Sequence, residues 1–273
     1  MDKLIEYLKY LFLGLVQGVT ELLPISSSGH LVIFEELFNM HEPKMIFEIF
    51  TNTASLIALI IIFYKVIGKL IKNFFLYIFK KEERENYQED FFYVLKLLIT
   101  AIPIGIVGLL FKDELGKIKN LLTVGIALFV TGALLLVIYL TRNKYESHEE
   151  VTWRDSMFMG FTQMFAIIPG LSRSGSTIIG GRASRLSLKS IIKFSMLVYI
   201  IVSIPASFLG IYDAVNTTES INWLGYSLAF IVTLIATYIT AKLILNKLRV
   251  DHFIYFSIYC LIVSGIAITL YFI

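Results

Sequence analysis

Long blocks of apolar residues constrain this chain most, because each block has the length of a helix that crosses a membrane. Hydrophobic residues fill 57% of the 273 positions and charged residues only 16%, against roughly 25% charged in soluble domains. A spanning helix needs roughly 20 apolar residues. The sequence therefore predicts an all-α polytopic membrane protein, a single integral membrane domain over residues 1–273, with spans at 49–64, 91–111, 120–141, 194–212, 221–241 and 253–273.

The distribution of charge sets the predicted topology. A net charge of +3 is too small for a nucleic-acid-binding protein, so no nucleic-acid partner is expected. Lys and Arg cluster at residues 65–84 and 142–154, whereas residues 213–220 contain none. By the positive-inside rule the two clusters lie in the cytoplasm and the C-terminus lies outside. Residues 65–90 are expected to form a hairpin or a surface helix on the cytoplasmic side.

Two further apolar stretches, at residues 10–23 and 156–168, are short and run directly into Pro, Gly and Ser. We expect both to be half-helices. The chain on either side of the second stretch is predicted to be cytoplasmic, so this stretch must enter and leave on one side. The first stretch would dip in from the outer face. The sequence thus predicts two oppositely oriented re-entrant helix-turn-helix hairpins in addition to the six spans.

These two stretches also resemble each other. GLVQGVTELLPISSSGHLVI at 14–33 aligns without gaps on GFTQMFAIIPGLSRSGSTII at 160–179. Gly and Ser can simply allow helices to pack closely, but two aligned clusters favour the paired broken helices of inverted-repeat membrane proteins. We therefore predict inverted-topology repeats, with repeat 1 at about residues 1–141 and repeat 2 at about residues 150–273.

The chemistry of both turns points to a bound anion. Non-helical backbone at membrane depth must be buried in protein or line a wet cavity, and a restarted helix directs free N–H groups toward that cavity, where phosphate is a natural ligand. Arg173 offers a charged fork for two phosphate oxygens and would be costly in the membrane without an anion. Helix capping could explain half of the serines. The candidate diphosphate-binding hydroxyls are those of Ser26, Ser28, Ser172, Ser174, Ser176 and Thr177.

Glu21 and His30 add groups that can carry out chemistry. Glu21 follows Gln17 at i+4, so both face the same side of the half-helix. The carboxylate could ligate a divalent cation or act as a base, with Gln17 as a neutral oxygen ligand. His30 lies just beyond the turn and could act as nucleophile or general acid.

Other polar residues carry weaker signals. Those that begin the first span could line the cavity or serve ordinary helix packing; they are Asn52, Thr53 and Ser55. The remaining histidines lack neighbours suited to catalysis and are expected at the membrane interface; they are His41, His148 and His252.

Two motifs, QGVTELLPISSSGHL at 17–31 and PGLSRSGSTI at 169–178, resemble the signature motifs of the bacterial undecaprenyl-diphosphate phosphatase family of the bacitracin-resistance type. The similarity extends across nearly the whole chain. It implies an enzyme of the bacterial plasma membrane that hydrolyses undecaprenyl (C55) diphosphate to undecaprenyl phosphate and inorganic phosphate. The reaction recycles the lipid carrier of peptidoglycan synthesis and confers bacitracin resistance. The resemblance also implies a divalent cation, Mg or Ca, and a pocket that opens to the outer face.

Carried over position by position, the family's motifs assign the catalytic roles to Glu21, Ser27, His30 and Arg173, with the metal at Glu21. This chain departs from the family in having Gln17 where many members have a second glutamate, and Ala54 where a glycine is common. The predicted metal site is therefore Glu21 with Gln17.

Several alternatives remain open at this level. Ser27 could form a phosphoserine, activated by His30 or Glu21; His30 could form a phosphohistidine; or water could attack directly. Ser27 is preferred. A secondary transporter or flippase for an anionic lipid would share the architecture, although a carboxylate beside a negative substrate disfavours it. The expected partners are a polyprenyl diphosphate and membrane lipid, with a homodimer left open.

Overall fold

The computed structural model describes residues 2–40, 46–142, 147–217 and 220–273. In these ranges no β-strand is found, apart from an isolated bridge between His148 and Leu186. The chain folds into helices in the order α1 (Asp2–Thr20), α2 (Ser27–Leu37), α3 (Ile46–Phe79), η1 (Lys81–Glu83), α4 (Arg84–Lys117), α5 (Leu121–Leu140), α6 (Trp153–Met164), η2 (Phe165–Ile167), α7 (Arg173–Ala183), α8 (Leu188–Asn216), α9 (Trp223–Lys247), η3 (Val250–His252) and α10 (Phe253–Phe272).

Within the described ranges, six helices are long and apolar enough to cross a membrane, and each overlaps one of the six predicted spans. They are α3, α4, α5, α8, α9 and α10. Large apolar side chains remain exposed on them, including Leu110, Phe208 and Ile262. Such faces are stable against lipid tails but not against water. The all-α polytopic membrane fold is therefore confirmed.

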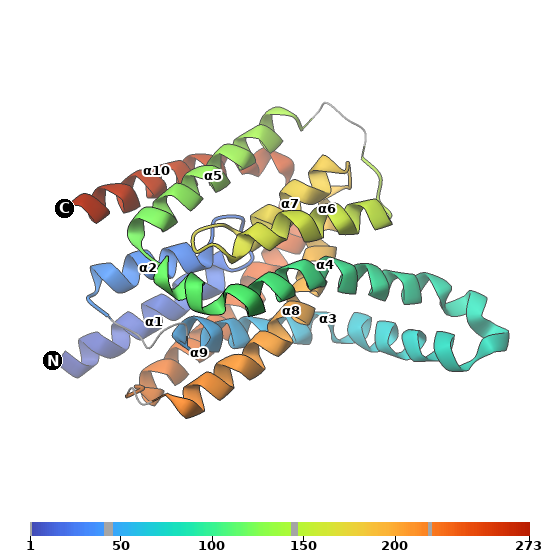
Figure 1. Cartoon of the computed structure of the whole chain (residues 1–273), viewed down its shortest axis with the longest axis horizontal. Helices are drawn as coiled ribbons and strands as arrows, with labels where there is room; N and C mark the ends of the chain where they lie inside the picture. The colour runs from blue at the N-terminus through green and yellow to red at the C-terminus, as the bar shows by residue number, and fades with distance from the viewer. Residues whose placement is uncertain (1, 41–45, 143–146, 218–219) are drawn as a thin grey trace.

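Helices α3 and α4 form a long hairpin that extends beyond the rest of the bundle (Figure 1). α3 runs without interruption to Phe79, and the 3-10 turn η1 leads directly into α4. The arms are joined by stacked rings, with Phe91 at centroid distances of 5.0 Å from Phe74 and 4.1 Å from Tyr77. Of the two alternatives for residues 65–90, the hairpin is therefore found and the surface helix is not.

The two broken segments each form a helix-turn-helix hairpin, and the two hairpins come from opposite ends of the bundle, so that their turns meet inside it (Figure 1). α1 is longer than predicted, since it begins at Asp2 and not near residue 10. A serine caps each restarted helix: Ser26 Oγ accepts the N–H of Gly29 at 3.2 Å, and Ser172 Oγ accepts that of Gly175 at 3.0 Å. Entry and return on one membrane face remain a prediction.

Helices matched by the sequence alignment pack in corresponding ways. α1 packs against α9, and α6 packs against α4. On α1, a Cβ at Gly14 would lie 2.5 Å from the carbonyl oxygen of Ala229; on α6, a Cβ at Gly160 would lie 3.1 Å from that of Thr100. Both glycines therefore allow close approach to a helix from the other half of the chain. The repeat boundaries remain a prediction, and residues 143–146 between them lie outside the described ranges.

Candidate functional site

A polar cavity lies where the two turns meet. Its volume is about 130 Å³, and its lining residues are Glu21, Ser26, Ser27, Ser28, Glu48, Asn52, Ala166, Leu171, Ser172 and Arg173. The second turn is tied to the first by Ser174, whose hydroxyl donates to the carbonyl of Leu23 at 2.8 Å. The two motifs, far apart in sequence, thus form a single site.

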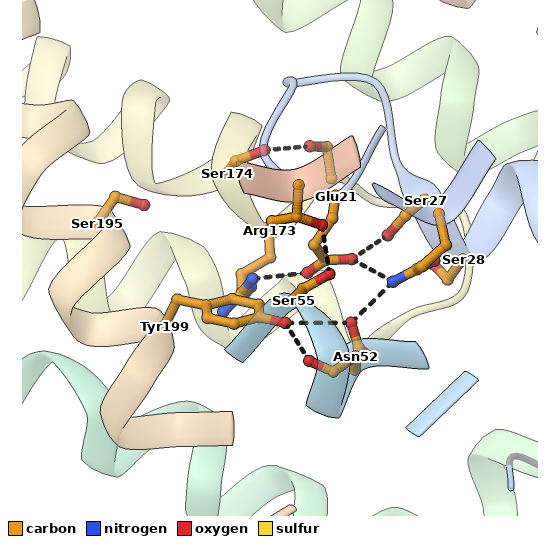
Figure 2. A network of polar contacts seen from close by, with 12 residues as sticks. Glu21, Ser27, Ser28, Asn52, Ser55, Arg173, Ser174, Ser195 and Tyr199 are labelled. Carbon is orange, nitrogen blue, oxygen red and sulfur yellow. Dashed lines mark hydrogen bonds and ion pairs between the residues drawn. The ribbon is translucent and has the colours of Figure 1, made fainter. Parts of the chain in front are cut away.

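Glu21 is the centre of a hydrogen-bond network (Figure 2). Its side chain is only 7% exposed, and Arg173 Nη2 donates to its Oε1 at 2.8 Å. Its Oε2 accepts from Ser27 Oγ at 2.5 Å and from Gln17 Nε2 at 2.8 Å. A buried carboxylate needs such partners to remain ionised. A hydroxyl bonded to a carboxylate in this way can transfer its proton to it.

Arg173 is also held by Tyr199 on α8. The guanidinium carbon lies 3.9 Å from the centre of the Tyr199 ring. The Tyr199 hydroxyl donates to the backbone carbonyl of Asn52 at 2.9 Å, and Asn52 Oδ1 accepts from Gln17 Nε2 at 2.8 Å. These contacts fix the guanidinium between α8 and the two turns. Since arginine carries several N–H donors, the bond to Glu21 leaves others that can reach phosphate oxygens.

Gln17 turns its amide nitrogen toward the site, because both of its neighbours there, Glu21 and Asn52, present acceptor oxygens. Its Oε1 is buried and has no hydrogen-bond partner among the described residues. In this arrangement Gln17 orients Glu21. Its role as a metal ligand remains a prediction.

The cavity offers hard oxygen donors for a divalent cation. Across the described ranges, no cluster of three or more His, Cys, Asp or Glu side chains could hold a metal. The cavity is nevertheless lined by the carboxylate of Glu21 and the amide of Asn52. Mg²⁺ commonly binds through one or two carboxylates together with phosphate oxygens of the substrate. The residues therefore fit an ion that binds together with a diphosphate, not one held by protein ligands alone.

Both ring nitrogens of His30 are hydrogen-bonded to groups other than Ser27. Its Nδ1 lies 2.6 Å from the carbonyl oxygen of Ser26, so Nδ1–H donates there, and Nε2 accepts from the hydroxyl of Tyr259 at 2.7 Å. The two rings are parallel, with centroids 5.5 Å apart. His30 is buried and is not among the residues that line the cavity. Of the two groups that could activate Ser27, His30 and Glu21, the structure shows a hydrogen bond to Ser27 only for Glu21.

The other predicted hydroxyls divide between the cavity and helix contacts. Ser26, Ser28 and Ser172 line the cavity. Ser174 lies across the turn, where it also contacts the hydroxyl of Ser172 at 3.1 Å. Thr177 Oγ1 lies 2.7 Å from Ser195 Oγ on α8, and Ser176 is buried within α7. The structure thus brings three of the six predicted hydroxyls to the cavity.

The polar residues at the start of the first span serve both of the purposes considered for them. Asn52 lines the cavity. Thr53 donates to Ser207 at 2.9 Å, and Ser55 lies 2.9 Å from the hydroxyl of Thr237, so both join neighbouring helices.

Of the three remaining histidines, His148 and His252 are not among the residues that line the cavity. His148 Nε2 bonds to Asp155 at 2.8 Å, and His252 Nδ1 accepts the N–H of Arg249 at 3.4 Å. His41 lies outside the described residues.

Sequence reasoning missed Glu48, Tyr199 and Tyr259. Glu48 lies one helical turn before Asn52, and this i, i+4 spacing of two oxygen-bearing side chains at the start of a span could have revealed it. The two tyrosines are single aromatic residues within apolar helices that contain several others. No pattern in the sequence distinguishes them.

Comparison with known proteins agrees with the motifs. The family model described as "Bacitracin resistance protein BacA" matches residues 10–266. An undecaprenyl-diphosphatase of Acholeplasma laidlawii is 42% identical over 99% of both chains. One of Oceanobacillus iheyensis is 40% identical over 93% of both, and undecaprenyl-diphosphatase 1 of Bacillus cereus is 38% identical over 97% of both.

Proposed function

The chain belongs to the family of the bacitracin resistance protein BacA, and we propose that the cavity is the active site of an undecaprenyl-diphosphatase. The enzyme hydrolyses undecaprenyl diphosphate to undecaprenyl phosphate and inorganic phosphate. This reaction recycles the lipid carrier of cell-wall synthesis and accounts for bacitracin resistance. The observation that carries the assignment of the site is the 2.5 Å hydrogen bond from Ser27 Oγ to Glu21, in a cavity also lined by Arg173.

Ser27 is the nucleophile in this mechanism. Its Oγ–H proton passes to Glu21, a bond forms between Oγ and the terminal phosphorus, and the bond from that phosphorus to the bridging oxygen breaks. Glu21 then gives the proton to the departing undecaprenyl phosphate. In the second half, Glu21 takes a proton from the attacking water and returns it to Oγ as inorganic phosphate leaves. The proton balance closes with one water consumed.

Arg173 stabilises the negative charge that the terminal phosphoryl group carries through both steps. Its position is fixed in advance by Glu21 and Tyr199, which is what makes such a charge effective in catalysis. Hydroxyls of Ser26, Ser28 and Ser172 donate to the remaining phosphate oxygens. A magnesium or calcium ion held by Glu21 and the diphosphate oxygens would offset further phosphate charge.

We place the cavity toward the outer face of the bacterial plasma membrane. Glu48 lies in the first turn of α3, and α3 begins at the end of the bundle opposite to the α3–α4 hairpin tip (Figure 1). The tip carries Lys80, Lys81 and Arg84, which favour the cytoplasm. The prenyl tail would extend sideways into lipid.

The test is phosphate release from undecaprenyl diphosphate by the purified full-length protein in detergent. We expect release that depends on Mg²⁺ or Ca²⁺, stops with a chelator, and is absent from a folded Ser27→Ala variant. Lack of release by the folded wild-type protein, with substrate binding retained, would instead support the lipid transporter. Full activity of Ser27→Ala would remove Ser27 as the nucleophile but leave the overall activity in place.

A further inference from the structure

Three charged side chains from three parts of the chain meet beside the cavity. Lys119 lies between α4 and α5, and its Nζ is 3.3 Å from Glu48 Oε2 and 3.8 Å from Glu35 Oε2. The side chains are largely buried: Lys119 is 13% exposed, Glu48 12% and Glu35 15%. Exposed ion pairs contribute little because water screens them, but charges buried to this extent interact more strongly.

Glu48 is the member of this group that faces the site, since it lines the polar cavity together with Glu21 and Arg173. Glu21 is already paired with Arg173 at 2.8 Å. A diphosphate entering the cavity brings several negative charges, and the carboxylate of Glu48 would repel them at close range. A cation that neutralises Glu48 therefore changes how well the cavity binds the substrate.

We propose that Lys119 sets the affinity of the cavity for the diphosphate by neutralising Glu48. The proposal rests on the function assigned above and makes Lys119 a positioning residue that contacts no reacting atom. Burial lowers the pKa of the Lys119 ammonium, but the carboxylates of Glu48 and Glu35 raise it above its usual value overall. Lys119 therefore stays charged at neutral pH. Glu35 on α2 is the second carboxylate beside its Nζ, at 3.8 Å, and is not among the residues that line the cavity.

Steady-state kinetics of phosphate release from undecaprenyl diphosphate test the proposal. We expect Lys119→Met to raise KM about tenfold with kcat within about twofold, because the lost charge acts on binding and not on the reacting bond. Lys119→Arg keeps the charge and should stay close to wild type. The matched control is Lys80→Met, which removes an equal charge from the hairpin tip, where Lys80 pairs with Glu83 at 3.2 Å.

The double variant separates neutralisation from a merely structural bridge. If Lys119 acts by cancelling the charge of Glu48, adding Glu48→Gln to Lys119→Met should restore KM to within about threefold of wild type. A structural bridge would be broken equally in both variants, and KM would not recover. An unchanged KM in Lys119→Met, or no recovery in the double variant, overturns the proposal.

Glu48→Gln alone gives an independent decision if Lys119→Met fails to fold. The proposal predicts an unchanged or lower KM and an unchanged magnesium concentration at half-maximal rate. A raised KM with a higher magnesium requirement would make Glu48 a metal ligand and overturn the proposal.

A binding measurement tests the role of Lys119 even if the wild-type protein releases no phosphate and the proposed function fails. The affinity for inorganic pyrophosphate is measured by calorimetry on the wild-type protein and on Lys119→Met. We expect weaker binding to Lys119→Met, and equal affinities would reject the role of Lys119.

Discussion

In the proposed mechanism Glu21 acts both as the base for Ser27 and as a ligand of the cation. Each of its oxygens has a donor, from Arg173 on one side and from Ser27 and Gln17 on the other. Gln17 donates a hydrogen bond to Glu21, whereas a second glutamate at this position would repel it. This chain therefore has an amide that orients Glu21 in place of a second carboxylate that could bind a metal. Removing any one partner therefore alters the charge, the proton or the orientation of the same group.

Replacing Glu21 by Gln tests its charge. The substitution keeps the volume and removes the base, so we expect turnover to fall at least about a hundredfold, the usual range for loss of a general base. Thermal unfolding of the purified variant is the control for its fold. A folded Glu21→Gln protein that keeps more than about a tenth of the wild-type rate would exclude Glu21 as the base.

Arg173→Lys tests geometry at constant charge. An ammonium cannot contact Glu21, stack on Tyr199 and offer a fork to two phosphate oxygens at once. We expect kcat to fall at least about tenfold. The kcat and KM of the purified variant test this expectation. Near-normal values would mean that a point charge suffices and that the stacked geometry has no catalytic role.

Trapping the intermediate distinguishes Ser27 from His30. Brief incubation with terminally labelled substrate, followed by acid, should leave acid-stable phosphate on Ser27, whereas phosphohistidine would be lost in acid. Ser27→Ala and Glu21→Gln should be about as defective together as singly, because the two act as one unit. Label on His30, which bonds to Ser26 and Tyr259 in the structure, or strictly multiplicative losses would contradict this pairing.

At the scale of elements, the site is made by two helices that restart inside the bundle. α2 and α7 have 11 residues each and begin directly after a capping serine. The residues that line the cavity from these helices belong to their first turns, where free N–H groups and the helix dipole favour an anion. The second turn passes close to α5 at Gly170, whose φ is +96°, and a Cβ there would lie 2.8 Å from the backbone of Val124.

Gly170→Ala should therefore weaken the whole site. A side chain at this φ and in this space costs roughly 1 to 3 kcal/mol, so we expect a clearly lower melting temperature and reduced activity. Gly105→Ala on α4 is the matched control, because a Cβ at Gly105 meets nothing within 4 Å. Equal melting temperatures for the two variants would show that the turn can absorb the added atom.

At the scale of the whole molecule, the arrangement of the helices predicts how the bundle is oriented in the membrane. The α3–α4 hairpin tip and the C-terminal end of α8 lie at opposite ends of the bundle (Figure 1). Asn86 follows the basic tip, and Asn216 lies at the end of α8; both are exposed. We expect an impermeant thiol reagent to label a cysteine at 216 in intact cells but not one at 86, after the buried Cys260 is replaced. Labelling at 86 but not at 216 would mean that the protein has the opposite orientation in the membrane, with the cavity on the cytoplasmic side.

The sequence by itself determined the spans, the breaks and most of the chemistry. Runs of apolar residues are local, and their length alone is matched to a bilayer, so all six membrane helices could be located, although α3 continues to Phe79, well beyond the predicted end at residue 64. Proline, glycine and serine also act locally, which is why both helix restarts were found. Glu21, Ser27 and Arg173 stood out because charge or hydroxyl groups inside such segments need a partner.

Only the tertiary structure decided which groups touch. It paired Ser27 with Glu21 and His30 with Tyr259 on α10. It also stacked the Tyr199 ring against the guanidinium of Arg173 and placed Glu48 in the lining of the cavity. The contacts from α8 and α10 join residues separated by long stretches of chain, and the direction of each side chain depends on how its helix is rotated against neighbours from the other half of the molecule. That rotation depends on packing at glycines such as Gly210 on α8, which lies against Ile49, and Gly125 and Gly132 on α5, which lie against α10. Packing between distant segments leaves no local pattern in the sequence.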